Sequence, residues 1–136
     1  HSVESLRLLK EVNKQALKNN RIINVLLQFH IAEEDSKFGL SMEECMELLE
    51  SDTYLGMQNV RIRGVMGMAT FTKDHEQVRD EFKNLKKIFD DLKSSSLSTE
   101  NDFNVISMGM SGDYEIAIEE GSNMIRIGST IFGARN

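Results

Sequence analysis

Two stretches near the C-terminus combine glycines with hydroxyl side chains, the residue types that bind phosphate. The first is SMGMSGD, residues 107–113, and the second is RIGST, residues 126–130. Glycine lets backbone N–H groups approach an anion, and a serine hydroxyl can donate to it. Ser111 in the first stretch, and Gly128 and Ser129 in the second, are therefore candidate phosphate ligands. Each stretch alone is also consistent with an ordinary helix cap or turn, and both interpretations stay open.

Arg126 is a further candidate, because it stands between Ile125 and Ile127 in an apolar segment. A buried guanidinium must be paired or must contact a ligand. Lys37 lies in the polar loop after the first long apolar segment. It is either an exposed loop lysine or a contact to an anion or a partner.

Spacing indicates no catalytic or metal-binding constellation. His30 and His75 have no partner at metal-ligand spacing, and Cys45 falls on the apolar stripe of a predicted helix. No Ser/His/Asp or Cys/His arrangement for nucleophilic catalysis can be argued from the order of residues. We therefore assign no catalytic residue and no metal ligand to this chain.

Alternating helices and strands are predicted as the scaffold of these candidates. The predicted strands are residues 21–31, 60–68, 103–108 and 123–127; the predicted helices begin at Ser2, at the capping box Ser41–Glu44, before Val78 and at Ser111. This order, without a hairpin signal, predicts an α/β fold whose parallel strands are joined by right-handed helical crossovers. In a closed barrel of such units, phosphate binds in the loops after the last two strands, where both stretches lie.

Composition narrows the class of protein. The chain has 136 residues, a net charge of -6, one cysteine and no proline. The acidic balance excludes an electrostatic surface for nucleic acid or an anionic membrane. A lone cysteine excludes an intrachain disulfide framework, so we expect a reducing, cytoplasmic setting. Because the chain starts at His1 rather than Met, we expect it to be a piece of a longer protein.

Four stretches of this sequence are similar to one known family. Residues 106–136, ISMGMSGDYEIAIEEGSNMIRIGSTIFGARN, resemble the C-terminal signature of the YggS/PROSC family of pyridoxal-phosphate-binding proteins. The stretches HSVESLRLLKEVNK, VLLQFHIAEEDSKFG and RIRGVMGMATFT agree with it in order and spacing, so the resemblance covers the whole chain. The family is similar to the N-terminal barrel domain of alanine racemase and is regarded as a carrier of pyridoxal 5′-phosphate (PLP) without established turnover.

The resemblance implies a fold and a set of site residues. Family members begin with barrel strands that this chain lacks, including the strand whose lysine forms the Schiff base with PLP. Residues 1–136 would then be a single region, the C-terminal half (about strands five to eight) of a TIM-type (β/α)8 barrel. By position, Ser111, Gly128 and Ser129 would bind the phosphate and Arg126 would face the pyridine nitrogen, whereas Lys37 matches only a loop lysine.

The expected function is therefore PLP binding in vitamin B6 homeostasis, with the phosphate loops present and the Schiff-base lysine absent. We expect no enzymatic activity, and the alternative is a fragment of a PLP-dependent amino-acid racemase. The expected cofactor contact is with the phosphate moiety alone. Open strand edges at both ends of a half-barrel also predict possible self-association.

Overall fold

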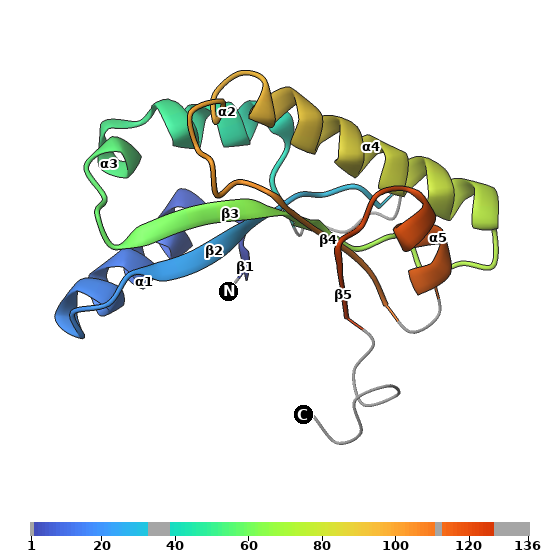
Figure 1. The fold of residues 1–136 in the computed structure, drawn as a ribbon, viewed down its shortest axis with the longest axis horizontal. Helices are drawn as coiled ribbons and strands as arrows, with labels where there is room; N and C mark the ends of the chain where they lie inside the picture. The colour runs from blue at the N-terminus through green and yellow to red at the C-terminus, as the bar shows by residue number, and fades with distance from the viewer. Residues whose placement is uncertain (1, 33–38, 111–112, 127–136) are drawn as a thin grey trace.

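Five parallel strands form one sheet in the computed structural model, which describes residues 2–32, 39–110 and 113–126. The strands are β1 (Ser2–Val3), β2 (Ile23–Gln28), β3 (Val60–Gly67), β4 (Val105–Met110) and β5 (Met124–Arg126). They lie side by side in chain order, and each pairs in parallel with the next (Figure 1). The predicted α/β class with crossover connections is confirmed.

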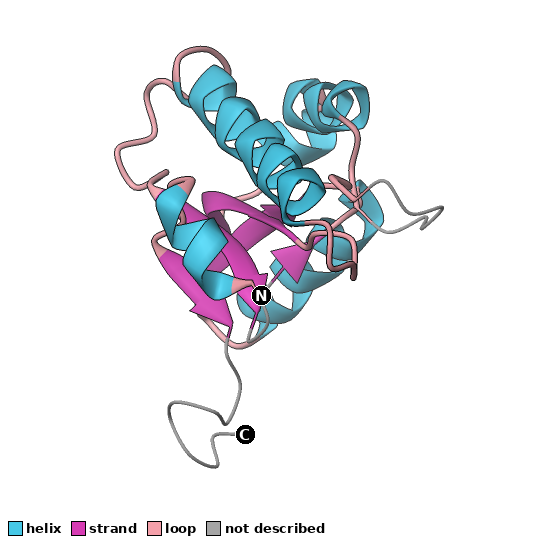
Figure 2. Cartoon of the chain, turned by 90° about the vertical axis from the view of Figure 1, so that its right-hand side faces the viewer, coloured by secondary structure: helices cyan, strands magenta, loops and turns pink. Residues whose placement is uncertain are grey.

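The connections between strands carry the helices. They are α1 (Leu6–Lys18), α2 (Met42–Glu50), α3 (Asp52–Leu55), α4 (His75–Lys93) and α5 (Tyr114–Glu119). The helices lie against the sheet, and α2 and α4 run along the same side of it (Figures 1 and 2). The predicted capping box is confirmed, since the Glu44 N–H donates to Ser41 Oγ at 3.1 Å and the Ser41 N–H donates to Glu44 Oε1 at 2.9 Å. No described helix is long and apolar enough to cross a membrane.

The start of the chain differs from the prediction of a helix that begins at Ser2. Ser2 and Val3 instead form β1, which pairs with Leu26 and Leu27 of β2. The helix begins after Ser5, whose hydroxyl accepts the Leu8 N–H at 3.1 Å. Either serine could cap a helix, and the complete burial of Val3 decides between them because it favours an extended segment against the sheet.

Two shorter helices also differ from the sequence-based expectation. Helix α3 was not expected as a separate element; the Ser51 hydroxyl accepts the Tyr54 N–H at 3.1 Å and starts it immediately after α2. Helix α5 begins at Tyr114 with Asp113, rather than Ser111, at its N-cap position. Both helices are short, four and six residues long, and the Asp113 side chain makes no cap hydrogen bond at the start of α5.

The core forms between the sheet and the helices. As predicted, α4 buries one apolar face, and the ring of Phe89 on this face stacks on Phe103 with centroids 4.9 Å apart. Leu27, Val65 and Ile106 lie in register on adjacent strands and are buried. The buried α4 residues of the predicted stripe are Val78, Phe82, Leu85, Phe89 and Leu92. This packing fixes the strand ends from which the candidate site is built.

Candidate functional site

The candidate site lies at the carboxyl edge of the sheet. Strands β2, β3, β4 and β5 end there at Gln28, Gly67, Met110 and Arg126. Because the strands are parallel, the connections that follow them leave the sheet at the same edge. Ligands of parallel α/β folds bind at this edge. The second stretch begins at Arg126, the last residue of β5, whereas residues 107–110 of the first stretch lie within β4, which extends two residues beyond its predicted end.

The β4–β5 register brings together Met110 of the first stretch and Arg126 of the second. The backbone of Met110 pairs with that of Arg126, and Ser107 pairs with Met124. Met110 directly precedes the first predicted phosphate ligand, and Arg126 lies two residues before the second. Arg126 is described here by its backbone alone. The other predicted contacts, Ser111, Gly128, Ser129 and Lys37, lie outside the described residues.

Gly109 shapes the end of β4. Its φ of +97° lies in the left-handed region, and a Cβ placed on it would lie 2.6 Å from the Cβ of Ala117 in α5. The same Cβ would lie 3.3 Å from the Cα of Tyr114. Glycine is therefore required for the close approach of α5 to β4. Gly109, one of the two glycines in SMGMSGD, thus has a packing role beside any role toward an anion.

Ser122 and Asn123 form hydrogen bonds that connect the start of β5 to β4, the two strands that precede the predicted phosphate ligands. The Asn123 Oδ1 accepts the Ile106 N–H at 2.8 Å, and its Nδ2 donates to the Asn104 carbonyl at 2.7 Å. The Ser122 Oγ lies 3.0 Å from the Met108 carbonyl oxygen. Sequence reasoning missed both residues because their partners are backbone groups of another strand. These side chains therefore add hydrogen bonds between β4 and the residues that lead into β5.

A buried carboxylate fixes the β3–α4 connection at the same edge. Glu81 is 3% exposed; its carboxylate accepts the Thr70 N–H at 2.7 Å and the Thr70 hydroxyl at 2.6 Å. Gln77 Nε2 also donates to it, at 3.3 Å. Glu81 falls three residues after Val78 and four before Leu85, on the apolar stripe of α4. This position is the sequence signal that could have identified Glu81 as an anchoring residue, since an acidic residue on a buried stripe needs hydrogen-bond donors.

We expect Glu81→Ala to lower the free energy of unfolding by about 2 kcal/mol, because it leaves the Thr70 N–H without this acceptor. Glu81→Gln keeps one carbonyl oxygen and should cost less. Urea denaturation measures both, with Asp80→Ala as the matched control on the exposed side of α4. The control should stay within about 0.5 kcal/mol of the unmodified chain. Equal losses for Glu81→Ala and Asp80→Ala would refute the anchoring role.

Arg79 connects α4 to α5, the helix that follows the first phosphate-like stretch. Its Nη2 donates to Glu119 Oε1 at 2.7 Å, and its Nη1 donates to Glu120. The hydrogen bonds to Glu119 and Glu120 raise the pKa of Arg79. Because the guanidinium is planar and binds both carboxylates, it fixes the orientation of α5 relative to α4 as well as the distance between them. Arg79 therefore holds the C-terminal end of α5 against α4.

Cys45 is a core residue, as its place on the apolar stripe predicted. It is fully buried, and burial raises the pKa of its thiol to about 12. The thiol therefore stays protonated near neutral pH, whereas the thiolate is the nucleophile and the metal ligand. Within residues 2–32, 39–110 and 113–126, no group of three or more His, Cys, Asp or Glu side chains is placed to hold a metal ion.

Comparison with known proteins settles the family. A family model described as the alanine racemase N-terminal domain matches residues 1–136, the whole chain. The chain belongs to this family. It is similar to the pyridoxal phosphate homeostasis proteins of Aquifex aeolicus (36% identical over 99% of this chain) and Escherichia coli K12 (32% identical over all of it). The resemblance found in the sequence is thereby confirmed.

Solved structures agree with this family assignment, and their chains are longer than this one. PipY of Synechococcus elongatus, solved without PLP, superposes with a TM-score of 0.84 over 98% of this chain at 26% identity. PipY with PLP bound gives a TM-score of 0.79 at the same identity. The chain covers 60% and 59% of these structures, 57% of the Aquifex protein and 56% of the E. coli protein. It therefore spans little more than half the length of these relatives.

Proposed function

We propose that this chain binds PLP by its phosphate at the carboxyl edge of β4 and β5, as the C-terminal half of a TIM-type barrel. The observation that supports this most is the pairing of Met110 with Arg126. It brings Met110 of SMGMSGD beside Arg126 of RIGST, at the strand ends where barrels of this kind bind phosphate. The similarity of the whole chain to PLP homeostasis proteins is the reason for proposing PLP as the ligand.

The proposed contacts divide between the phosphate and the ring. The phosphate oxygens would accept hydrogen bonds from three residues. Ser111 and Ser129 would each donate through the hydroxyl and the backbone N–H, and Gly128 would donate through its N–H. These are the donor types that phosphate requires, and glycine at 128 lets the backbone approach. Arg126 would contact the pyridine nitrogen, and an arginine there would keep that nitrogen unprotonated and so weaken the ring as an electron sink. PLP itself, when bound, supplies an electrophilic aldehyde and an electron-withdrawing ring.

The proposed role is reversible binding of the cofactor, as in vitamin B6 homeostasis, rather than turnover. No lysine of this chain occupies the sequence context of the family's cofactor lysine. Borohydride reduction in the presence of PLP, followed by mass spectrometry, should therefore yield no stoichiometric pyridoxyl-lysine. One fully modified lysine at a single position would contradict this part of the proposal.

We expect PLP and inorganic phosphate to compete for one site, and pyridoxal, which lacks the phosphate, to bind at least tenfold more weakly than PLP. The double variant Ser111→Ala, Ser129→Ala should weaken PLP binding at least tenfold, since two hydroxyl hydrogen bonds to a charged group are lost, at about 1.5 kcal/mol or more each. Equilibrium dialysis measures these affinities.

The matched control removes one hydroxyl far from the proposed site. Ser98 lies in the exposed segment between α4 and β4, so Ser98→Ala should leave the affinity for PLP unchanged. Equal PLP affinities for the double variant and the control would contradict the assigned phosphate ligands. Equal affinities for PLP and pyridoxal would contradict phosphate binding itself.

A further inference from the structure

Strand β4 carries a buried hydroxyl that has no hydrogen-bond partner. Ser107 is 1% exposed, and its side chain forms no hydrogen bond within residues 2–32, 39–110 and 113–126. Most buried polar side-chain atoms in proteins have a partner, so an exception calls for an explanation. A buried hydroxyl without a partner also lowers the free energy of unfolding. Ser107 is therefore a candidate ligand-binding residue.

Ser107 lies on the face of the sheet away from α4. Its neighbours Ile106 and Met108 belong to the hydrophobic core beneath the helices, and side chains alternate between the two faces of a strand. Gly67, which pairs with Met108, is also on the helix side, because a Cβ on it would lie 3.2 Å from the side chain of Leu85 in α4. In a closed barrel the face away from the helices is the interior.

The strand register extends Ser107 into a row of side chains on this face. Met66 of β3 pairs with Ser107, and Gln28 of β2 pairs with Met66. On the other side, Ser107 pairs with Met124 of β5. Met66 is 5% exposed, yet it does not belong to the core beneath the helices. Since Ser107 precedes Ser111 by four residues, the row lies beneath the proposed phosphate contacts rather than among them.

The row places a hydrogen-bonding side chain on each side of an apolar one. The side chain of Gln28 is half-buried and, like that of Ser107, forms no hydrogen bond in the part of the chain that the structure describes. Adjacent strands lie about 4.8 Å apart, so the backbones of Gln28 and Ser107 are about 10 Å apart across Met66. That distance leaves room for one six-membered ring with a hydrogen bond on each side. An apolar surface with a few polar groups is typical of small-molecule sites.

We propose that Gln28, Met66 and Ser107 form the floor of the PLP site and bind the ring of the ligand. The Ser107 hydroxyl and the Gln28 amide form hydrogen bonds with the hydroxyl and aldehyde oxygens of the ring, and Met66 packs against the ring. This inference rests on the proposed function, to which it adds residues that recognise the ring rather than the phosphate. Inorganic phosphate has no ring, so its binding should not depend on this row.

Equilibrium dialysis with PLP and with inorganic phosphate tests the inference. Ser107→Ala and Gln28→Ala should each weaken PLP binding at least threefold and leave the affinity for phosphate within twofold. The double variant Ser111→Ala, Ser129→Ala should weaken the binding of both ligands, since it removes proposed phosphate contacts. The ratio of the two affinities therefore separates ring contacts from phosphate contacts.

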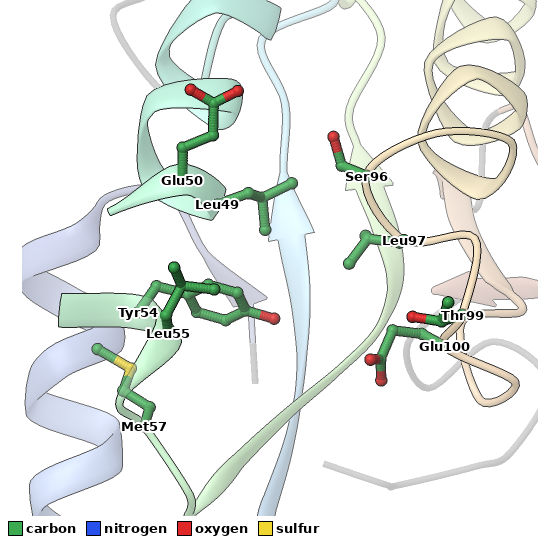
Figure 3. Close-up of a pocket in the computed structure, with 9 residues that line it drawn as sticks. All are labelled: Leu49, Glu50, Tyr54, Leu55, Met57, Ser96, Leu97, Thr99 and Glu100. Carbon is green, nitrogen blue, oxygen red and sulfur yellow. The ribbon is translucent and has the colours of Figure 1, made fainter. Parts of the chain in front are cut away.

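Two matched controls remove the same chemical groups elsewhere. Asn24→Ala removes an amide from the same face of β2, four residues nearer its amino end. Ser96→Ala removes a hydroxyl from a groove between the α2–α3 segment and the α4–β4 connection (Figure 3). Because α3 directly precedes β3 and this connection directly precedes β4, the groove lies at the amino ends of the strands. Both controls should leave the affinity for PLP within twofold.

Urea denaturation without ligand distinguishes ligand binding from a structural role of Ser107. Removing a buried hydroxyl that has no partner is neutral or stabilising, so the midpoint of Ser107→Ala should equal or exceed that of the unmodified chain. A lower midpoint, an unchanged PLP affinity, or equal losses for PLP and phosphate would each overturn the inference. If the unmodified chain binds neither ligand, the proposed function fails and this inference fails with it. If it binds both and Ser107→Ala behaves like Ser96→Ala, this inference alone fails.

Discussion

Gly64→Ala should lower the free energy of unfolding by about 3 kcal/mol, at the upper end of the cost of overpacking. A Cβ on Gly64 would lie 1.9 Å from the carbonyl oxygen of Val105 and 2.6 Å from its carbonyl carbon. Both atoms belong to the backbone of β4, so no rotamer change can relieve the contact. The β2–β3 register shifts at the same place, between Val25 and Leu26, and Leu26 pairs with Gly64. The added carbon would therefore force β3 and β4 apart at the middle of the sheet.

Urea denaturation of Gly64→Ala beside Gly56→Ala measures this effect. A Cβ on Gly56 would approach no atom closer than 3.5 Å, and the backbone there is right-handed. Gly56→Ala should therefore change the free energy of unfolding by less than about 0.5 kcal/mol. Equal unfolding midpoints for the two variants would show that β3 and β4 are not packed as described.

Gly109→Ala is expected to have the second large effect, about 3 kcal/mol in the free energy of unfolding together with a loss of PLP affinity. The left-handed backbone costs an alanine about 1–2 kcal/mol. The 2.6 Å approach to the Cβ of Ala117 adds the cost of displacing α5 from β4. Since Ser111 follows Gly109 by two residues, a displaced α5 should also move the proposed phosphate ligands. We expect PLP binding to weaken at least tenfold.

Gly121→Ala separates the cost of the left-handed backbone from the cost of the contact with α5. Gly121 has a φ of +111°, but a Cβ there would meet only the flexible side chain of Lys86, at 3.0 Å. Gly121→Ala should therefore cost about 1 kcal/mol for the backbone alone and leave PLP affinity within twofold. Chemical denaturation measures the free energy of unfolding of both variants, and equilibrium dialysis measures their PLP affinity. A cost for Gly109→Ala no larger than that for Gly121→Ala would exclude the contact with α5.

Much of the fold followed from the spacing of apolar residues. The long helix α4 and the strands β2 to β4 were expected because each buries a recognisable periodic or continuous apolar segment. The strand β1 was missed, since two residues, Ser2 and Val3, are too few to show a period. Ser111 is a good N-cap residue type, but α5 begins after Asp113, whose side chain makes no cap hydrogen bond, so residue type alone does not locate the start of this helix.

The candidate site was only partly predictable. Residue types indicate SMGMSGD and RIGST, but the register that pairs Met110 with Arg126 depends on strand pairing, which a single sequence does not reveal. The anchoring by Glu81 was also missed, because its partner, Thr70, lies in a connection whose path depends on tertiary packing. The sequence therefore indicated the chemistry of the site and left its geometry to the structure.

Phosphate titration followed by NMR tests the central claim most directly. In a series of ¹H–¹⁵N spectra of the full chain, inorganic phosphate should shift the amide resonances of residues 111–113 and 128–130 saturably. PLP should shift the same amides at lower concentration, and the spectrum of Ser111→Ala, Ser129→Ala should respond weakly. Saturable shifts confined to other parts of the chain, or no saturable shift with either ligand, would contradict phosphate binding at the carboxyl edge of β4 and β5.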